Sequence, residues 1–277
     1  MIIDCHVHMI EEKGYEDRLV KEMDKLKLDK ICLLAMQPIP FWGSRAASNE
    51  RLLEACARYP ERLIPFGFVD LGMDPPTIVD RLFTAGCKGL KVTRTRLPYN
   101  DDRLLDYYRR AAIYGMPILF HTGTVLRTPD DRYYDVDCSR MRPIFLDRIA
   151  RLFPELSLIG AHLGNPWYDE AAMTLFWNEN VYFDLSGTIL KRKNKEWFDQ
   201  TLWWNESVMG KLAQDEGTFY ANVGQHPFSR ICFGSDVPIH EMAGVVEEYR
   251  ALIKAMNMPE EVVRRVMGGN IQRMLGL

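Results

Sequence analysis

An alternation that runs the whole length of the chain constrains the fold more than any other feature. Eight short runs of apolar or β-branched residues are separated by longer amphipathic segments, with prolines and glycines at the joints. The short runs predict strands at 2–8, 30–36, 63–69, 87–93, 117–122, 156–162, 181–187 and 230–235. Among the longer segments, the clearest helical patterns lie at 49–58, 101–113 and 140–153.

Eight strand–helix repeats within 277 residues, with no linker between them, favour a closed (β/α)₈ barrel (TIM barrel) over an open doubly wound sheet. The first strand is not followed by a glycine-rich phosphate loop, which argues further against a dinucleotide-binding fold. We therefore predict an α/β protein with a single domain over 1–277, whose tail at 259–277 forms helices against the barrel exterior.

Charge and cysteine content narrow the class of partner. A net charge of −3 offers no basic surface to nucleic acid or anionic lipid, so we expect a small-molecule substrate. The six cysteines are scattered without a C-x-x-C pair, which predicts reduced, buried thiols. A charged leader and an apolar run of about 18 residues are both missing from the sequence, which makes a cytoplasmic protein the expectation.

The first predicted strand ends in Asp4-Cys5-His6-Val7-His8. Residues two apart on a strand share a face, with Cα atoms roughly 6.6 Å apart. The imidazoles of His6 and His8 could therefore converge on one metal ion. Asp4, two residues deeper, is expected on the same face, as a partner that steadies the site and not as a ligand. Two histidines near a strand end could also be ordinary polar residues. A metal site therefore requires further ligands at the ends of other strands.

A barrel places its chemistry at the C-terminal ends of its strands. His121, His162 and Asp236 end the fifth, sixth and eighth predicted strands. Each alone has a plainer explanation, as a hydrogen-bonded rim histidine or as a helix N-cap. Together with His6 and His8 they predict a metal site. Imidazole and carboxylate ligands suit Zn²⁺, with Mn²⁺, Fe²⁺, Co²⁺ or Ni²⁺ open. The set of His6, His8, His121 and Asp236 would leave a coordination position for water or substrate.

The order of these ligands resembles the amidohydrolase superfamily. The sequences around them are similar to one branch of it, the amidohydrolase-related group that contains aminocarboxymuconate-semialdehyde decarboxylase. The resemblance runs from residue 2 to the C-terminus, and its motifs lie at 120–123, 159–164, 182–187, 233–238 and 269–270.

The resemblance implies an enzyme. A metal ion lowers the pKa of bound water from about 15.7 to about 7, and a carboxylate can shuttle its proton to a leaving group. Asp236 is the predicted shuttle; His162 is either a ligand of a second metal or a donor to a substrate carbonyl or carboxylate. The leading hypothesis is hydrolysis of a small ester, lactone or amide that can carry a carboxylate. The alternative is non-oxidative decarboxylation or hydration, and a barrel that binds without turnover is a third hypothesis. The resemblance also admits a homo-oligomer.

Further residues carry less specific predictions. Lys91, on the fourth strand, could be carboxylated and bridge two metals, bind an anionic substrate group or pair with a carboxylate. Arg94 and Arg96 follow it and could bind a substrate carboxylate. Aromatic residues could roof the pocket or pack structurally: Trp167, Tyr168, Phe198, Trp203 and Trp204. His226 is read as structural and His240 as within reach of the site, and 191–195 is read as a solvated charged face.

Overall fold

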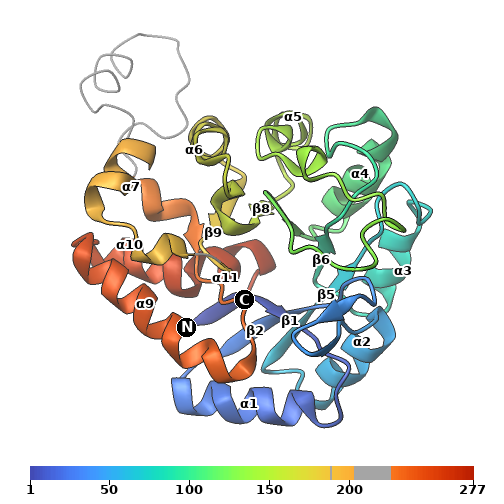
Figure 1. Cartoon of the computed structure of the whole chain (residues 1–277), viewed down its shortest axis with the longest axis horizontal. Coiled ribbons are helices and arrows are strands. Elements are labelled where there is room, and N and C mark those ends of the chain that lie inside the picture. The colour runs from blue at the N-terminus through green and yellow to red at the C-terminus, as the bar shows by residue number, and fades with distance from the viewer. Residues whose placement is uncertain (188, 203–225) are drawn as a thin grey trace.

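The computed structural model describes residues 1–187, 189–202 and 226–277 (Figure 1). Eight parallel strands form one sheet in the order β1-β2-β5-β6-β7-β8-β9-β10. The strands are β1 (Ile3–His8), β2 (Lys30–Leu34), β5 (Leu63–Phe68), β6 (Gly89–Val92), β7 (Ile118–Phe120), β8 (Leu158–Gly160), β9 (Val181–Asp184) and β10 (Ile231–Cys232). Each lies within a predicted run, and the predicted single-domain (β/α)₈ barrel is confirmed.

The barrel is closed where β10 meets β1. The Cys5 amide donates to the Phe233 carbonyl at 2.9 Å, and the Asp236 amide donates to the His6 carbonyl at 2.7 Å. The Asp4 carboxylate reinforces this seam, since its Oδ1 accepts from the amides of His6 and Ser235, both at 3.0 Å. The seam therefore joins the first and last strands at the level where His6 and Asp236 stand.

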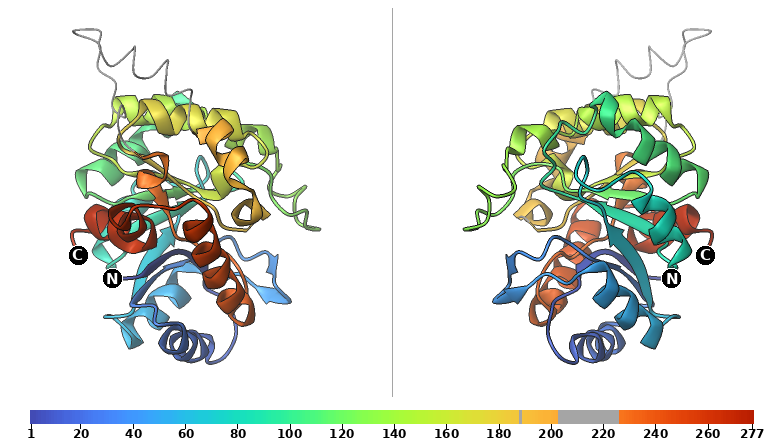
Figure 2. Two further views of the ribbon diagram at one scale, coloured as in Figure 1. Left: turned by 90° about the vertical axis from the view of Figure 1, so that its left-hand side faces the viewer. Right: turned by 90° about the vertical axis from the view of Figure 1, so that its right-hand side faces the viewer.

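Helices surround the barrel (Figures 1 and 2). They are α1 (Tyr15–Leu26), α2 (Asn49–Arg58), α3 (Ile78–Thr84), α4 (Leu105–Ile113), α5 (Phe145–Leu152), α6 (Tyr168–Trp177), α7 (Lys195–Leu202), α9 (Met242–Ala255), α10 (Glu260–Arg264) and α11 (Asn270–Leu275). The helix predicted over 140–153 begins only at Phe145. Pro143 explains the late start, because it lacks an amide hydrogen and holds Arg142 in an extended conformation with ψ 140°.

Two apolar layers hold the fold together. One cluster fills the barrel interior with side chains from alternate positions of the strands, such as Cys32, Leu34 and Phe66. Ile271 of α11 joins this cluster, and α11 lies at the end of the barrel near which both chain termini are found (Figure 2). The larger cluster lies between the strands and the surrounding helices. This arrangement leaves the opposite end of the barrel, at the carboxyl ends of the strands, for a site.

A small hairpin was not predicted. β3 (Pro40–Phe41) pairs with β4 (Ser44–Arg45) in the connection between β2 and α2. It is tied to the chain after β1 by a bridge between Ile10 and Ala46 and by the Ser44 hydroxyl, which donates to the Glu11 carbonyl. Two-residue strands are too short to give a period-2 pattern in the sequence.

Two sequence predictions need correction in detail. Cys138 is only half-buried, whereas the other five cysteines are buried and all six are free thiols. Lys191 does not belong to a solvated face: its side chain is 2% exposed and donates to the Leu185 carbonyl at 3.0 Å, with the ammonium 5.8 Å from the Tyr249 ring centroid. A lysine stem can be buried when its charged head finds such partners. Neighbouring Arg192 is exposed, as predicted.

Within the three described stretches, none of the helices combines the length and apolar character needed to cross a bilayer.

The C-terminal Gly269-Asn270 pair yields a test of the fold. The Asn270 side-chain amide donates to the Ser229 and Ile231 carbonyls, both at 3.0 Å, and so fastens α11 to β10. Asn270→Ala removes a donor from each of two buried carbonyls, and should lower the free energy of unfolding by about 1–3 kcal/mol. Chemical denaturation measures this. Gln272→Ala, at a half-buried position of the same helix, is the control; equal loss in both variants would contradict the fastening role.

Candidate metal centre

Three potential ligand atoms converge where β1 and β10 end. His6 and His8 close β1, and Asp236 lies four residues beyond β10. The two Nε2 atoms are 3.3 Å apart, and Asp236 Oδ1 lies 3.5 Å from His8 Nε2 and 3.8 Å from His6 Nε2. Ligands bound tetrahedrally at about 2.0–2.1 Å from Zn²⁺ are spaced by about 3.3 Å, close to these separations. His6, His8 and Asp236 can therefore hold a metal ion together.

The hydrogen bonds at the outer edges of three imidazoles leave their inner nitrogens without a proton. His6 Nδ1 donates to Asp184 Oδ2 at 2.8 Å, His162 Nδ1 donates to the Ser186 carbonyl at 2.9 Å, and His121 Nε2 donates to the Thr124 carbonyl at 3.1 Å. Because these oxygens only accept, each neutral ring must present a lone pair on its other nitrogen. Fixing the tautomer in this way prepares a histidine to bind a metal.

Burial keeps the two imidazoles of β1 neutral. It lowers the pKa of His6 to about 3 and the pKa of His8 well below its ordinary value. Burial raises the pKa of Asp184, but the adjacent His6 and the hydrogen bonds to the carboxylate lower this pKa by more than burial raises it. Asp184 therefore stays ionised. Burial also lowers the pKa of Lys91 to about 8 and raises that of Asp236 to about 8. In the absence of a cation, the site thus disfavours charge.

The arrangement of donors fits a cation. Asp236 Oδ1 and His8 Nδ1 are buried atoms that make no hydrogen bond within the described residues. His162 Nε2 and His121 Nδ1 face each other at 3.3 Å, although the outer hydrogen bonds leave both without a proton. Lone pairs directed at one another are unfavourable, and a positive ion between these donors would relieve the mismatch.

His121 and His162, both predicted ligands, flank the three-residue group. His162 follows β8 and its Nε2 lies 3.7 Å from Asp236 Oδ2. His121 follows β7 and meets the group through His162. All five predicted ligands thus lie at one end of the barrel, with His6, His8 and Asp236 forming the tight cluster.

A cavity of about 280 Å³ opens above the cluster. Its lining includes His8, His121, His162, Asp236, Lys91, Arg94, Met36, Phe41, Trp42, Thr93, Thr124, Val125, Leu126, Asn165 and Gly187. Trp42, Arg94, His162 and Asp236 have φ between 46° and 60°, a region that few residues other than glycine adopt. Strained backbone of this kind concentrates at functional sites.

Lys91 and Arg94 line the cavity, but they have different surroundings. Lys91 is 1% exposed, and its ammonium lies 3.3 Å from His6 Nε2. Arg94 is already engaged, since its guanidinium donates to Asp131 at 2.8 Å and to the Leu126 carbonyl at 2.9 Å. Arg94 therefore anchors the loop that contributes Leu126 to the cavity wall. Arg96 donates to the Tyr133 carbonyl on the same loop.

Trp167 does not line this cavity. Instead, the Arg142 guanidinium lies over its ring, 5.5 Å from the ring centroid. His240 points away into solvent, with its side chain 80% exposed, whereas His226 caps a short 3₁₀ helix at 227–230, in agreement with a structural role. Phe198 is buried in the outer core. Trp203 and Trp204 fall outside the described residues.

The expectation that Asp4 shares the face of His6 and His8 is wrong. Ile3 and Cys5 point into the barrel interior, so Asp4 between them points outward, and the register of β1 against β2 shifts between Asp4 and Val7. Such an irregularity breaks the strict alternation that the prediction assumed. Asp4 supports the site through the His6 backbone and not through an imidazole.

Sequence reasoning missed four contributors. Asp184 ends β9, and its carboxylate accepts from His6 and the His162 amide; Ser186 donates to it at 2.5 Å. Asp184 ends its strand in the structure, whereas the predicted strand continued to 187 and placed it in the middle. Phe41 and Trp42 roof the cluster, with ring centroids 5.0 and 6.1 Å from that of His8. They lie on the hairpin, whose two-residue strands are too short to show a strand pattern in the sequence.

Comparison with known proteins agrees with this picture. Residues 3–277 match the family described as Amidohydrolase. An uncharacterised TIM-barrel protein of Bordetella bronchiseptica is 15% identical, with a TM-score of 0.67 over 99% of this chain and 98% of that one. A dihydroxybenzoic acid decarboxylase of Polaromonas sp. JS666, solved with manganese and 2-nitroresorcinol, is 16% identical, with a TM-score of 0.64 over 100% and 97%. The 5-carboxyvanillate decarboxylase of Sphingomonas paucimobilis is 15% identical, with a TM-score of 0.63 over 100% and 99%.

None of the curated proteins matches the chain. A barrel with a histidine–aspartate cluster at the carboxyl ends of its strands defines a class of metal-dependent enzymes. The chain belongs to the amidohydrolase family, as its motifs predicted, and is an enzyme of that superfamily.

Metal stoichiometry tests the centre. Protein stripped with a chelator and reloaded with Zn²⁺ or Mn²⁺ should hold one ion per chain by elemental analysis. His8→Ala should weaken binding by more than about 100-fold, and Asp184→Asn by about 10–100-fold, because a partner that orients a ligand contributes on that scale. His240→Ala, an exposed histidine, is the control and should bind normally. Two ions per chain would contradict a mononuclear centre and favour a modified Lys91.

Gly187 yields a second test, because it stands against two site residues. Its φ is +62°, and an added Cβ would lie 2.9 Å from both Asp236 Oδ2 and His162 Cε1. Gly115 has nearly the same φ, +61°, with nothing within 4 Å of the added atom. Gly187→Ala and Gly115→Ala should each lose about 1–2 kcal/mol of stability from the left-handed backbone. Only Gly187→Ala should also lose metal affinity in a titration; equal affinities would show that the contacts are dispensable.

Proposed function

We propose that this protein is a metal-dependent non-oxidative decarboxylase of a small, planar carboxylic acid. The observation that carries the proposal is one juxtaposition within a cavity of about 280 Å³. The His-His-Asp cluster, the buried Lys91 ammonium and the aromatic pair of Phe41 and Trp42 all face the same space. Two decarboxylases among the structural neighbours, which share the fold at low identity, support the same direction.

His6, His8 and Asp236 would hold the metal, with His121 and His162 beside them. A divalent ion supplies fixed positive charge that stabilises negative charge on substrate oxygens. Nitrogen and carboxylate donors suit Zn²⁺ and Mn²⁺ alike. The Polaromonas protein was solved with manganese, so we propose either ion and leave the choice to elemental analysis.

Lys91 and the hairpin would bind and orient the acid. The Lys91 ammonium is desolvated, so an ion pair with a substrate carboxylate would be stronger there than at the surface. Phe41 and Trp42 are tilted by 32° with centroids 4.3 Å apart, and offer aromatic surface to a planar ring. Met36 and Val125 add apolar walls that would exclude water.

Decarboxylation also needs a proton at carbon. As the bond to the carboxylate breaks and CO₂ leaves, the electron pair stays on the substrate carbon, which must take up one proton. We assign the donor role to the Asp236 carboxyl, because it faces the cavity beside the cluster. His162 Nε2, 3.7 Å from Asp236 Oδ2, is placed to return a proton from solvent.

Hydrolysis of an ester, lactone or amide, the leading hypothesis from sequence, requires the same metal ligands. The aromatic roof and the buried ammonium favour decarboxylation of a planar carboxylate over this hydrolysis. A barrel that binds without turnover would not need the complete set of inward-facing donors.

An assay for both products separates the reactions. On a panel of hydroxylated benzoates and unsaturated carboxylates, the metal-loaded protein should release CO₂, and esters and lactones of the same acids should release no acid. Asp236→Asn should lower the rate by about 10²–10⁴-fold, the usual contribution of a positioned proton donor. Asp169→Asn, on the exposed start of α6, is the control. Acid release without CO₂ would overturn the proposal in favour of hydrolysis.

A further inference from the structure

Tyr249 is a buried tyrosine that the proposed reaction does not use. It lies on α9, which packs against the outer side of the barrel (Figure 1), and its side chain is 0% exposed. The Phe233 ring meets it edge to face, with the ring centroids 4.8 Å apart and the planes at 90°. Burial raises the pKa of the Tyr249 hydroxyl well above its ordinary value, so the hydroxyl keeps its proton and can donate it.

The Tyr249 hydroxyl bonds to the backbone of two strand ends at once. It accepts from the Leu185 amide at 3.2 Å and from the Gly234 amide at 3.3 Å. Its own proton can go to the Cys232 carbonyl at 3.3 Å or to the Gly234 carbonyl at 3.4 Å. A hydroxyl has two acceptor lone pairs and one proton, so its whole hydrogen-bonding capacity is used on these two segments.

These bonds lie where the ladder between β9 and β10 stops. The last residue pair of the ladder is Asp184 with Cys232. Leu185 follows directly, and side chains hold both of its backbone polar groups: its amide donates to Tyr249, and its carbonyl accepts from Lys191 Nζ at 3.0 Å. The Tyr249 hydroxyl therefore continues the connection between the two strand ends beyond their ladder.

Gly234, on the other side of this connection, stands against two residues that set up the metal centre. A Cβ added at Gly234 would lie 3.1 Å from His6 Cβ and 3.2 Å from Asp184 Cβ. Leu185 is the direct neighbour of Asp184 in the chain. Both amides that Tyr249 holds thus belong to backbone that touches the pair of Asp184 and His6, whose 2.8 Å hydrogen bond turns the His6 lone pair toward the cluster.

We propose that Tyr249 is a positioning residue of the metal centre: its hydroxyl fixes the separation of the β9 and β10 ends and thereby the geometry between Asp184 and His6. Tyr249 neither lines the metal cavity nor belongs to the ligand cluster, so it acts through these residues. The proposal rests on the metal centre of the proposed function but not on the reaction, because its test is metal binding.

Tyr249→Phe removes the hydroxyl and keeps the ring. Co²⁺ is the probe, because its visible absorption bands depend on the number and arrangement of its ligands. After chelator stripping and reloading, the variant should bind Co²⁺ about threefold to tenfold more weakly, a smaller loss than the one expected for Asp184, which touches a ligand directly. The visible bands of the bound Co²⁺ should also change in position or intensity, which a loss of stability alone would not cause.

Tyr107→Phe is the matched control. Tyr107 is 3% exposed, and its hydroxyl also joins backbone groups, since it accepts from the Gly72 amide at 3.2 Å and donates to the Asp74 carbonyl. None of these three residues lines the metal cavity. Both variants should unfold at lower denaturant concentration, but Tyr107→Phe should keep the Co²⁺ affinity and spectrum of the unsubstituted protein.

A double variant tests the route of action. Because Tyr249 acts on the geometry between Asp184 and His6, Tyr249→Phe should cost no further affinity once Asp184→Asn is in place. Additive losses in the double variant, equal losses in Tyr107→Phe, or an unchanged affinity and spectrum in Tyr249→Phe would each overturn the proposal.

Hydrogen exchange in the unsubstituted protein gives a measurement that needs no variant to fold. Coupling between two sites is reciprocal, so loading with Zn²⁺ should slow exchange at the Leu185 and Gly234 amides. The effect should exceed that at the Ile31 amide, which donates to the Arg62 carbonyl at the start of β2. Equal changes at all three amides would overturn this proposal alone, whereas a protein that binds no metal would overturn the proposed function as well.

Discussion

The site depends on the hydrogen bonds that the buried Asp184 carboxylate accepts. This carboxylate accepts from His6 Nδ1, from the His162 amide and from Ser186, and so ties β1, the turn after β8 and the end of β9 to one point. The free energy of desolvating this charge is offset only because four donors surround it. The same bonds turn the His6 lone pair inward. Structure and ligand chemistry are thus set by one group.

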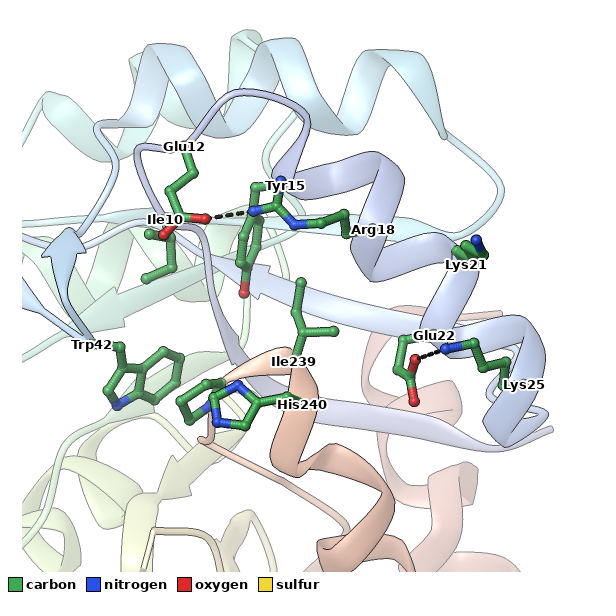
Figure 3. A pocket seen from close by; sticks show the side chains of 11 residues that line it. Ile10, Glu12, Tyr15, Arg18, Lys21, Glu22, Lys25, Trp42, Ile239 and His240 are labelled. Atoms are coloured by element: carbon green, nitrogen blue, oxygen red, sulfur yellow. Dashed lines mark hydrogen bonds and ion pairs between the residues drawn. The ribbon is translucent and has the colours of Figure 1, made fainter.

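The aromatic hairpin gives the barrel a character that its ligand set alone does not. Phe41 and Trp42 cover the metal cluster on one side, and Trp42 also lines a second hollow, of about 580 Å³, beside α1 (Figure 3). Trp42 has φ 46°, a conformation that needs support from its surroundings. The hairpin supplies this support through its ties to the chain after β1. A change in the hairpin would therefore reach both hollows.

Much of the fold was predictable because its signals are local. Each of the eight strands buries most of its side chains, and a run of apolar residues is enough to reveal it. The helix over 49–58 was predicted to the residue, since Ser48 caps it and its pattern is regular. The orientation of Lys191 and that of Asp4 were not predictable. Lys191 packs against the Tyr249 ring, and the Asp4 carboxylate accepts from the Ser235 amide; both partners lie far away in the sequence.

By itself, the sequence determined the barrel, the family and the end of the barrel at which chemistry occurs, because residue type and position along a strand are encoded locally. Only the tertiary structure decided which donors meet. It singled out His6, His8 and Asp236, added Asp184 as the group that orients His6, and paired the Arg94 guanidinium with Asp131 at the cavity wall. The physical reason is that proximity between strand ends depends on barrel closure and backbone turns, which no local pattern records.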